Sequence, residues 1–241
     1  MRKVLVIGIG AGDPEYVTVQ AIRALNAADV LFVLEKADEQ RDLIDLRHEI
    51  CRRYIEHEYR VVTAADPPRG RGAAAVAEWR SQRADICQRL IADLGADESG
   101  AFLVWGDPGL YDGTLAVLED ILARGNVEFT YEVIPGISAP SALAARHRVA
   151  LNRVGGSFEV TTGRRVAESS GDAVVMLDGD QAFRRIEPDG VEIFWGAYLG
   201  TPDEILLSGP LAEVADEIAR VRAEARSRKG WMFDTYLLRR S

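Results

Sequence analysis

The sequence of 241 residues lacks several features that would assign it to a function class at once. It has only two cysteines, Cys51 and Cys87, which share no metal-ligand spacing, so we expect buried free thiols and no metal site. It has no excess of positive charge, and its net charge of −9 at pH 7 argues against a nucleic-acid partner. It has no hydrophobic run of membrane length, because the apolar run near the N-terminus is broken by glycines and ends at Asp13. These absences predict a cytoplasmic protein with no metal, no nucleic-acid partner and no membrane contact.

The residues that are present predict an α/β protein of two domains. Apolar residues make up 47% of the chain, enough for a sizeable core, and the length favours two domains over one. Strand and helix patterns alternate as far as residue 147, which predicts an N-terminal domain, 1–147, with a mostly parallel sheet and helices on both faces. Residues 148–241 predict a smaller mixed α/β domain. The expected strands are 3–9, 29–36, 59–64, 101–105, 127–134, 157–162, 173–178, 191–199, 204–209 and 231–238, and the expected helices are 16–28, 41–55, 75–94, 113–125 and 211–226.

The first strand runs into a glycine loop, VLVIGIGAGDPEYVT at residues 4–18, that is close to a dinucleotide fingerprint. Gly8 and Gly10 fit G-x-G-x-x-G, and Glu35 ends the second strand where a ribose-binding acid would stand. The third glycine position, however, holds Asp13. A carboxylate there places negative charge where a pyrophosphate would approach the helix, so the loop argues against a nicotinamide cofactor.

Two further strands end in similar loops, FLVWGDPGLYDGT at 102–114 and YEVIPGISAP at 131–140. Each loop alone could be simple turn chemistry. Three together indicate a ligand site, because α/β sheets bind ligands at the carboxyl ends of their strands. Asp13 and Asp107 are acceptors beside accessible backbone, which suits a cationic ligand better than a phosphate. S-adenosylmethionine fits this chemistry, since its sulfonium, ammonium and ribose groups need acceptors.

Four ordered segments, GIGAGDPEYVT, WGDPGLY, PGIS and GAYLGTPDEILLSG, resemble the tetrapyrrole methyltransferase family over essentially the whole chain. The resemblance implies two α/β domains of the tetrapyrrole methylase type with the S-adenosylmethionine cleft between them. It also implies a homodimer, a polycarboxylate tetrapyrrole substrate and S-adenosylhomocysteine as a product. Two segments, NRVGGSFEVTTGRR and GWMFDTYLLRR, are most similar to those cobalamin-pathway members of the family that methylate C-1 of precorrin-5 and expel the C-20 acetyl group as acetate.

The same resemblance implies which residues contact the cofactor. The first-loop contact falls on Ala11, where many members of the family have proline. A contact near Thr235 on the last strand is also implied. The other implied cofactor contacts are Gly106, Asp107, Leu110, Ser138, Ala139, Leu177 and Leu199.

Release of acetate needs a positioned acid or base, and the candidates are Asp13 and Tyr111. Each has a structural alternative: Asp13 as a helix cap, Tyr111 as a wall residue. Local arginines would offset the acidic net charge for a polycarboxylate substrate, because guanidinium groups pair with carboxylates. The predicted substrate-binding residues are Arg153, Arg164 and Arg165, with Arg146, His147 and Arg148 also near the expected domain joint.

Three alternatives to a precorrin methyltransferase stay open at this point. A diphthine synthase, which methylates a protein side chain, shares the glycine loops, but the arginines and the C-terminal segment favour a tetrapyrrole. An oxidoreductase that binds NAD is indicated by the first loop alone and opposed by Asp13. A non-catalytic binding module is hard to reconcile with three convergent loops.

Overall fold

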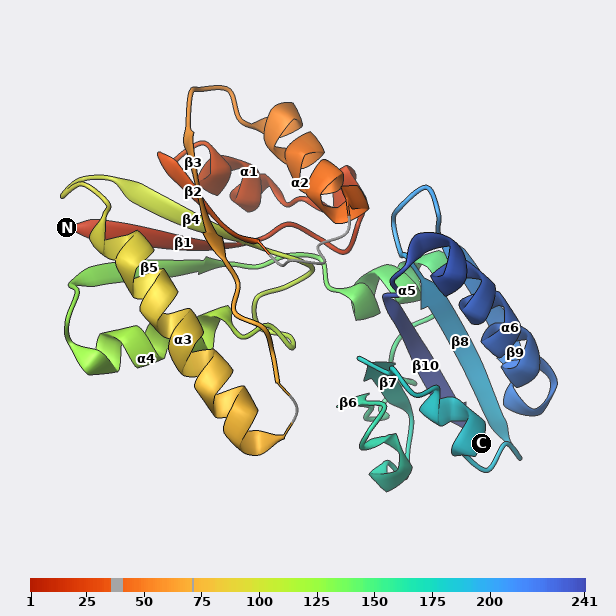
Figure 1. Ribbon diagram of the computed structural model, residues 1–241. Helices are drawn as coiled ribbons and strands as arrows, with labels where there is room; N and C mark the ends of the chain where they lie inside the picture. The colour runs from red at the N-terminus through yellow and green to blue at the C-terminus, as the bar shows by residue number, and fades with distance from the viewer. Residues whose placement is uncertain (36–40, 71) are drawn as a thin grey trace. The chain divides into compact units, whose positions relative to one another are not determined.

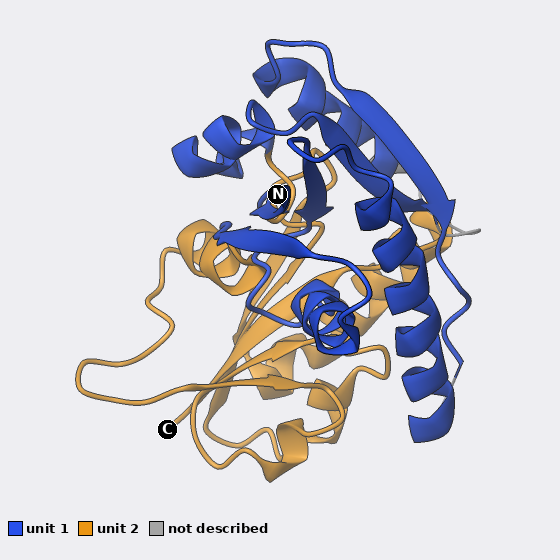
Figure 2. Ribbon diagram, turned by 90° about the vertical axis from the view of Figure 1, so that its left-hand side faces the viewer, with its two compact units in different colours: residues 1–10, 14–137 blue, residues 11–13, 138–241 orange. Residues whose placement is uncertain are grey.

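The computed structural model describes residues 1–35, 41–70 and 72–241, and for residues 41 and 42 only the backbone. The chain forms two compact units. Unit 1 consists of Met1–Gly10 and Pro14–Ile137, and unit 2 of Ala11–Asp13 and Ser138–Ser241 (Figure 2). Each unit has its own five-stranded sheet and its own core (Figure 1).

The sheet of unit 1 is parallel throughout, in the order β3-β2-β4-β1-β5. Its central strand β1 is an aliphatic run whose last five residues are buried, as expected for a strand covered on both faces. Since all five strands run in one direction, their carboxyl ends lie at a single edge of the sheet. The strands are β1 (Arg2–Gly8), β2 (Val30–Glu35), β3 (Arg60–Ala65), β4 (Ser99–Val104) and β5 (Phe129–Ile134).

Helices cover both faces of this sheet, which confirms the prediction. Val4 and Val6 of β1 belong to the core cluster that includes residues of α3 and α4, whereas Leu5 and Ile7 belong to the cluster with α1 and α2. Thr18 caps α1 by accepting a hydrogen bond from the amide of Ala21, so this helix is shorter than expected. The helices are α1 (Val19–Leu25), α2 (Arg41–Tyr54), α3 (Ala73–Ala92) and α4 (Thr114–Arg124), with a 3₁₀ turn η1 (Pro14–Tyr16).

The sheet of unit 2 is mixed, in the order β6-β7-β10-β8-β9. Strands β6 and β7 are parallel, and the other neighbours are antiparallel. The strands are β6 (Glu159–Thr162), β7 (Ala173–Met176), β8 (Val191–Ala197), β9 (Ile205–Pro210) and β10 (Asp234–Arg240). The helices are α5 (Ala139–His147) and α6 (Leu211–Lys229), and the 3₁₀ turns are η2 (Val166–Glu168) and η3 (Ala182–Arg185).

The units divide at a different place from the expected boundary after residue 147. Helix α5, which the sequence patterns did not predict, begins at Ala139 with Ser138 as its cap and belongs to unit 2. It packs against β8 and β10, and Nε2 of His147 lies 3.0 Å from the carbonyl oxygen of Trp195. Packing on the second sheet therefore moves the division ahead of α5. No helix in the described ranges is long and apolar enough to cross a membrane.

Candidate functional site

The three glycine loops of the sequence meet at the carboxyl edge of the unit 1 sheet, because β4, β1 and β5 are neighbours there. Gly10 and Gly106 exchange two backbone hydrogen bonds, of 3.3 Å and 2.8 Å. A Cβ atom on Gly8 would lie 2.6 Å from the nitrogen of Gly136, and one on Gly136 would overlap the carbonyl oxygen of Gly106. The glycines therefore allow the loops to pack backbone against backbone, which brings their peptide groups into one small area.

Asp107 holds two of these loops together. Its Oδ1 accepts a 2.8 Å hydrogen bond from the amide of Gly109, and its Oδ2 accepts a 2.9 Å bond from the amide of Gly136. Each carboxylate oxygen has a second lone pair, so the side chain keeps capacity to accept from a ligand. Leu110 follows in the same turn, with its amide 3.1 Å from the carbonyl oxygen of Asp107. Gly106, Asp107 and Leu110 thus lie together, as their shared loop requires.

Tyr111 stands out in this loop because its backbone is left-handed, with φ of 55°. Such a conformation costs a non-glycine residue about 1–3 kcal/mol, and it recurs at functional sites. The next residue, Asp112, accepts a 2.7 Å hydrogen bond from the amide of Thr114 and so fixes the turn into α4. The side chain of Tyr111 is 45% exposed.

The middle of the opening loop belongs to unit 2. Gly12 has φ of 153°, and a Cβ atom there would overlap the carbonyl oxygen of Leu199. Ala11 and Asp13, on either side, are half-buried. Because Thr18 caps α1, Asp13 does not serve as the cap of that helix. The structure therefore brings Ala11 and Asp13 near Leu199.

Ser138 and Ala139 lie at the start of α5. The hydroxyl group of Ser138 caps the helix by accepting a hydrogen bond from the amide of Ser141, at 3.3 Å. Both residues are half-buried. The first turn of a helix carries amide groups without a helical partner, and these suit a carboxylate. The predicted contacts Ser138 and Ala139 therefore lie where backbone amide groups are offered to a ligand.

Several of the residues predicted in unit 2 lie at one end of its sheet. Arg164 and Arg165 follow β6, and Leu177 follows the parallel strand β7. Strand β10 starts at the same end, where Thr235 pairs with Met176. Strand β8 ends there, so Leu199 lies just beyond it.

Backbone strain marks the same end. Leu177 and Tyr198 have φ of 54° and 50°, although neither is a glycine. Tyr198 is buried, and its hydroxyl donates a 2.6 Å hydrogen bond to the carbonyl oxygen of Trp231, which helps to hold it. Leu177 is different, because its side chain is 60% exposed and its own packing does little to fix the backbone. Backbone strain of this kind is frequent at functional sites.

A buried carboxylate, Asp178, follows Leu177 and is only 4% exposed. Its Oδ2 accepts hydrogen bonds from the amide of Ala182 and the hydroxyl of Tyr236, both at 2.7 Å. Its Oδ1 accepts a 3.2 Å bond from the amide of Asp180. Burial, together with this carboxylate, raises the pKa of Tyr236 above its ordinary value, so the phenol stays a donor.

A second buried carboxylate, Asp234, forms an ion pair with Arg222 of α6. The two side chains are each 5% exposed, and Nε of Arg222 donates to Oδ2 of Asp234 at 2.8 Å. The indole of Trp195 donates to the same oxygen at 3.0 Å, and Nη2 of Arg222 donates to the carbonyl oxygen of Asp178 at 2.9 Å. Burial raises the pKa of Asp234, while Arg222 and Trp195 oppose that rise. The pair thus ties α6 to the turn that carries Leu177.

These network residues were missed at the sequence level. One signal was available: Arg222 lies on the apolar face of α6 with Leu211, Ile218 and Ala225, where a charged residue needs a buried partner. Its partners Asp178 and Asp234 are far away in the sequence, and only the sheet pairing brings them together. The sequence therefore indicates a buried arginine but not the residues that it binds.

The predicted substrate arginines fall into two groups. Arg164 is exposed and forms no ion pair within the described residues, whereas Arg165 pairs with Glu168 through Nη2, at 2.9 Å. Arg153 donates a 2.6 Å bond to the carbonyl oxygen of Arg240 and pairs with Asp172 at 3.4 Å. Arg240 ends β10 and Asp172 precedes β7, so the guanidinium of Arg153 is held at the opposite end of the sheet. The structure places Arg164 and Arg165 with Leu177, and Arg153 apart from them.

Among the other residues singled out, Arg146 pairs with Glu204 at 2.6 Å, and His147 is half-buried against Phe194. Burial lowers the pKa of His147 from its ordinary value. Both cysteines are buried and free, as predicted, and burial raises the pKa of Cys51 to about 11 and that of Cys87 to about 12. Neither thiol is therefore suited to nucleophilic chemistry.

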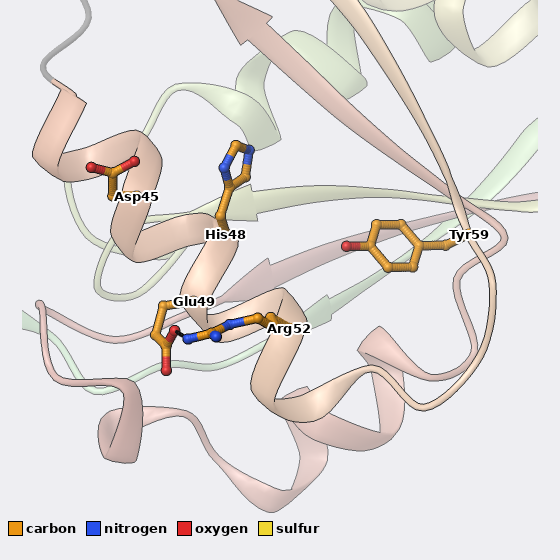
Figure 3. A pocket seen from close by; sticks show the side chains of 5 residues that line it. All are labelled: Asp45, His48, Glu49, Arg52 and Tyr59. Carbon is orange, nitrogen blue, oxygen red and sulfur yellow. Dashed lines mark hydrogen bonds and ion pairs between the residues drawn. The ribbon is translucent and has the colours of Figure 1, made fainter.

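A cavity of about 410 Å³ lies elsewhere on unit 1. Figure 3 shows four side chains of α2 along it, with Tyr59, which precedes β3, pointing its hydroxyl toward the helix. Tyr59 lies at the amino end of β3, whereas the glycine loops follow the carboxyl ends. None of the predicted site residues lines this cavity. The lining residues are Asp45, His48, Glu49, Arg52 and Tyr59.

Comparisons with known proteins agree on one family. The family model described as Tetrapyrrole (Corrin/Porphyrin) Methylases matches residues 3–215. A precorrin-6A synthase [deacetylating] from Sinorhizobium sp is 51% identical over 250 residues, which cover 100% of this chain and 96% of that protein.

Solved structures give the same result. The crystal structure of a putative cobalamin synthesis related protein (CobF) from Corynebacterium diphtheriae matches with a TM-score of 0.86 and 36% identity, covering 100% of this chain and 99% of that one. A uroporphyrin-III C-methyl transferase from Thermus thermophilus, complexed with S-adenosyl homocysteine, shares the fold at a TM-score of 0.60 and 20% identity, covering 98% of this chain and 91% of that one.

Proposed function

The chain belongs to the tetrapyrrole (corrin/porphyrin) methylase family, and we propose that it is a precorrin methyltransferase of cobalamin biosynthesis. It transfers a methyl group from S-adenosylmethionine to C-1 of precorrin-5 and releases the C-20 acetyl group as acetate, giving precorrin-6A. The observation that carries this proposal is the 51% identity, over the whole chain, to a precorrin-6A synthase [deacetylating]. A nicotinamide cofactor, suggested by the first loop alone, has no support from the family.

The residues present fit S-adenosylmethionine, which supplies a methyl group on a sulfonium cation. In unit 1, Asp107 and the closely packed loop backbones offer acceptors for its cationic and hydroxyl groups. In unit 2, the first turn of α5 offers amide groups for its carboxylate. The exposed apolar side chain of Leu177 offers a surface for its uncharged parts.

For methyl transfer the protein has to align two bound molecules and exclude water, and this step needs no strong base. Loops fixed by backbone hydrogen bonds suit that task, because they lose little freedom on binding. Gly10, Gly106 and Asp107 form such a fixed set. We assign the alignment of the cofactor to these loops together with Leu177 and Leu199.

Release of acetate requires proton transfer. The oxygen of a water molecule bonds to the acetyl carbonyl carbon, the bond from that carbon to the ring breaks, and its electron pair passes to the macrocycle. A base takes the proton of the water. We assign the base to Asp13 and a hydrogen-bond donor to the acetyl carbonyl oxygen to Tyr111, supported by the half-buried position of the aspartate and the exposed, strained position of the tyrosine.

The substrate carries several carboxylates. Among the predicted arginines, Arg164 is best placed to bind one of them, because it is exposed and has no ion pair in the described ranges. Arg165 forms a solvent-exposed ion pair with Glu168, and such pairs contribute little to stability. Replacing this pair by a pair with a substrate carboxylate would therefore cost little free energy. The tight contacts of Arg153 favour a structural role for it instead. We further expect a homodimer in the cytoplasm.

The test is incubation of the purified protein with precorrin-5 and S-adenosylmethionine, followed by mass spectrometry of the corrinoid and an assay for free acetate. We expect one added methyl group and one acetate for each macrocycle. Methylation without acetate would limit the function to methyl transfer at another position. No reaction with a tetrapyrrole, combined with methylation of a protein side chain, would favour a diphthine synthase.

A further inference from the structure

We propose that Asp178, held by the hydroxyl group of Tyr236, is a positioning residue that fixes the backbone of Leu177 for contact with S-adenosylmethionine. The proposal rests on the function proposed above, since it concerns the cofactor site of that reaction. It adds a buried residue pair to a site that the sequence described through loop residues alone.

The first step in the argument is the conformation of Leu177. Its φ of 54° lies in the region that favours glycine, yet its side chain is 60% exposed. A leucine does not favour this left-handed conformation by itself, so the neighbouring residues must impose it. Met176, before it, is fixed by pairing with Thr235 in β10. The residue after it, Asp178, supplies the other half of the constraint.

The second step is the set of contacts around Asp178. Its carboxylate accepts three hydrogen bonds, two of them at 2.7 Å, and its carbonyl oxygen accepts a fourth from Arg222. The hydroxyl of Tyr236 is the one side-chain donor to the carboxylate within the described residues, and it comes from the central strand β10. Tyr236 therefore locks the turn after Leu177 to the middle of the sheet.

The third step concerns Gly163, which follows β6 beside this turn. A Cβ atom there would overlap Oδ1 of Asp178 and would lie 2.7 Å from its Cβ. The glycine makes room for the buried carboxylate. Gly163 also precedes Arg164, so the same carboxylate lies between the turn of Leu177 and the predicted substrate arginine.

The experiment is Tyr236→Phe, which removes the hydroxyl and keeps the ring that packs edge-to-face on Phe183. We expect the Kd for S-adenosylmethionine, measured by calorimetry on the full chain, to rise about three- to tenfold, which corresponds to the net value of one ordinary hydrogen bond. The KM for the cofactor should rise with it, while kcat at saturating cofactor stays near that of the unchanged protein. Gly163→Ala, which displaces Asp178 from the other side, should act in the same direction.

The matched control is Ser169→Ala. This buried hydroxyl also donates to a carboxylate, Oε2 of Glu159 at 2.8 Å, but at the start of β6, away from Leu177. It should lower stability and leave the Kd unchanged. An equal rise of Kd in Ser169→Ala and Tyr236→Phe, or no rise in Tyr236→Phe, overturns the proposal.

A double-mutant cycle separates positioning from general stability. Glycine adopts a left-handed backbone without strain, so Leu177→Gly removes the need for the constraint. In that background, Tyr236→Phe should change the Kd much less than it does alone. The same fold-change in both backgrounds contradicts the proposal. Failure of the unchanged protein to bind S-adenosylmethionine at all would instead refute the proposed function.

Discussion

The two units differ in how they shape the loops that follow the ends of their strands. Unit 1 uses glycines, so that its loops contact each other through bare backbone at Gly8, Gly106 and Gly136. Unit 2 relies instead on leucine and tyrosine in left-handed conformations, at Leu177 and Tyr198, and holds them with hydrogen bonds of buried polar side chains. Unit 1 also has a left-handed tyrosine, Tyr111, beside its glycines. The first solution is visible in the sequence, because glycine is its signature. The second is hidden, because its constraint comes from residues far apart along the chain.

Breaking the buried ion pair of unit 2 should give the largest effect. We expect Arg222→Met to lower the free energy of unfolding by about 3–5 kcal/mol, because it leaves Asp234 charged and unpaired in the core. Arg220→Met, which removes an exposed pair with Glu224, should cost less than about 0.5 kcal/mol. Urea denaturation of both variants measures the difference. A double variant, Arg222→Met with Asp234→Leu, should recover most of the loss, and a loss that persists there would show that charge burial is not the cause.

Adding a methyl group to the glycine cluster of unit 1 should come second. Gly136→Ala places a Cβ atom against the carbonyl oxygen of Gly106, so the backbone must shift at a cost of about 1–3 kcal/mol. Gly113→Ala is the matched control, because nothing lies within 4 Å of its Cβ position and its φ is −94°. Thermal unfolding should show a lower midpoint only for Gly136→Ala. Similar midpoints would mean that the loops have room to separate.

Relieving the backbone strain at Leu177 should raise the free energy of unfolding, whereas the two preceding changes lower it. Leu177→Gly should stabilise the protein by up to about 1 kcal/mol, since glycine adopts the left-handed backbone freely. Leu122→Gly, at a partly exposed position inside helix α4, should instead destabilise it by about 1 kcal/mol. The same denaturation experiment checks both signs. Destabilisation by Leu177→Gly as well would mean that unit 2 holds this turn without strain.

The smallest effect should be a pH dependence located in unit 2. Burial lowers the pKa of His147 below its ordinary value of 6.5, so the unfolded chain binds a proton more readily than the folded one. The stabilising contribution is therefore full above pH 6.5 and is lost as the pH falls below that value. His147→Gln should flatten this part of the curve of stability against pH. An unchanged slope in His147→Gln would assign the dependence to another group.

The regular elements could be predicted from local patterns, and the reasons are physical. The continuous apolar run of β1 and the apolar faces of the unit 1 helices leave clear patterns in the sequence, so those strands and helices were confirmed. Helix α5 was missed because it is short and rich in small residues, and its stability comes from packing on β8 and β10. The division between the units was misplaced for the same reason.

The candidate site likewise contains residues that the sequence could locate and contacts that it could not predict. Loop residues such as Asp107 and Tyr111 could be located from the sequence, because each lies a few residues after a buried strand. The ion pair between Arg153 and Asp172 could not be predicted from the sequence, since it depends on the register of β7 and β10. The partners of Arg222 likewise follow from sheet pairing alone. Long-range contacts, rather than local chemistry, limited what the sequence could reveal.

Because Ala11–Asp13 belong to unit 2, the chain passes from one unit to the other after residues 10, 13 and 137 rather than once. A fragment of residues 138–241 would therefore lack the peptide that packs on Leu199 through Gly12. The second half is therefore incomplete by itself, so its exchange between related genes would succeed only if the opening loop were exchanged with it. Recombination at the apparent boundary is thereby disfavoured, and the two halves are expected to have been inherited together.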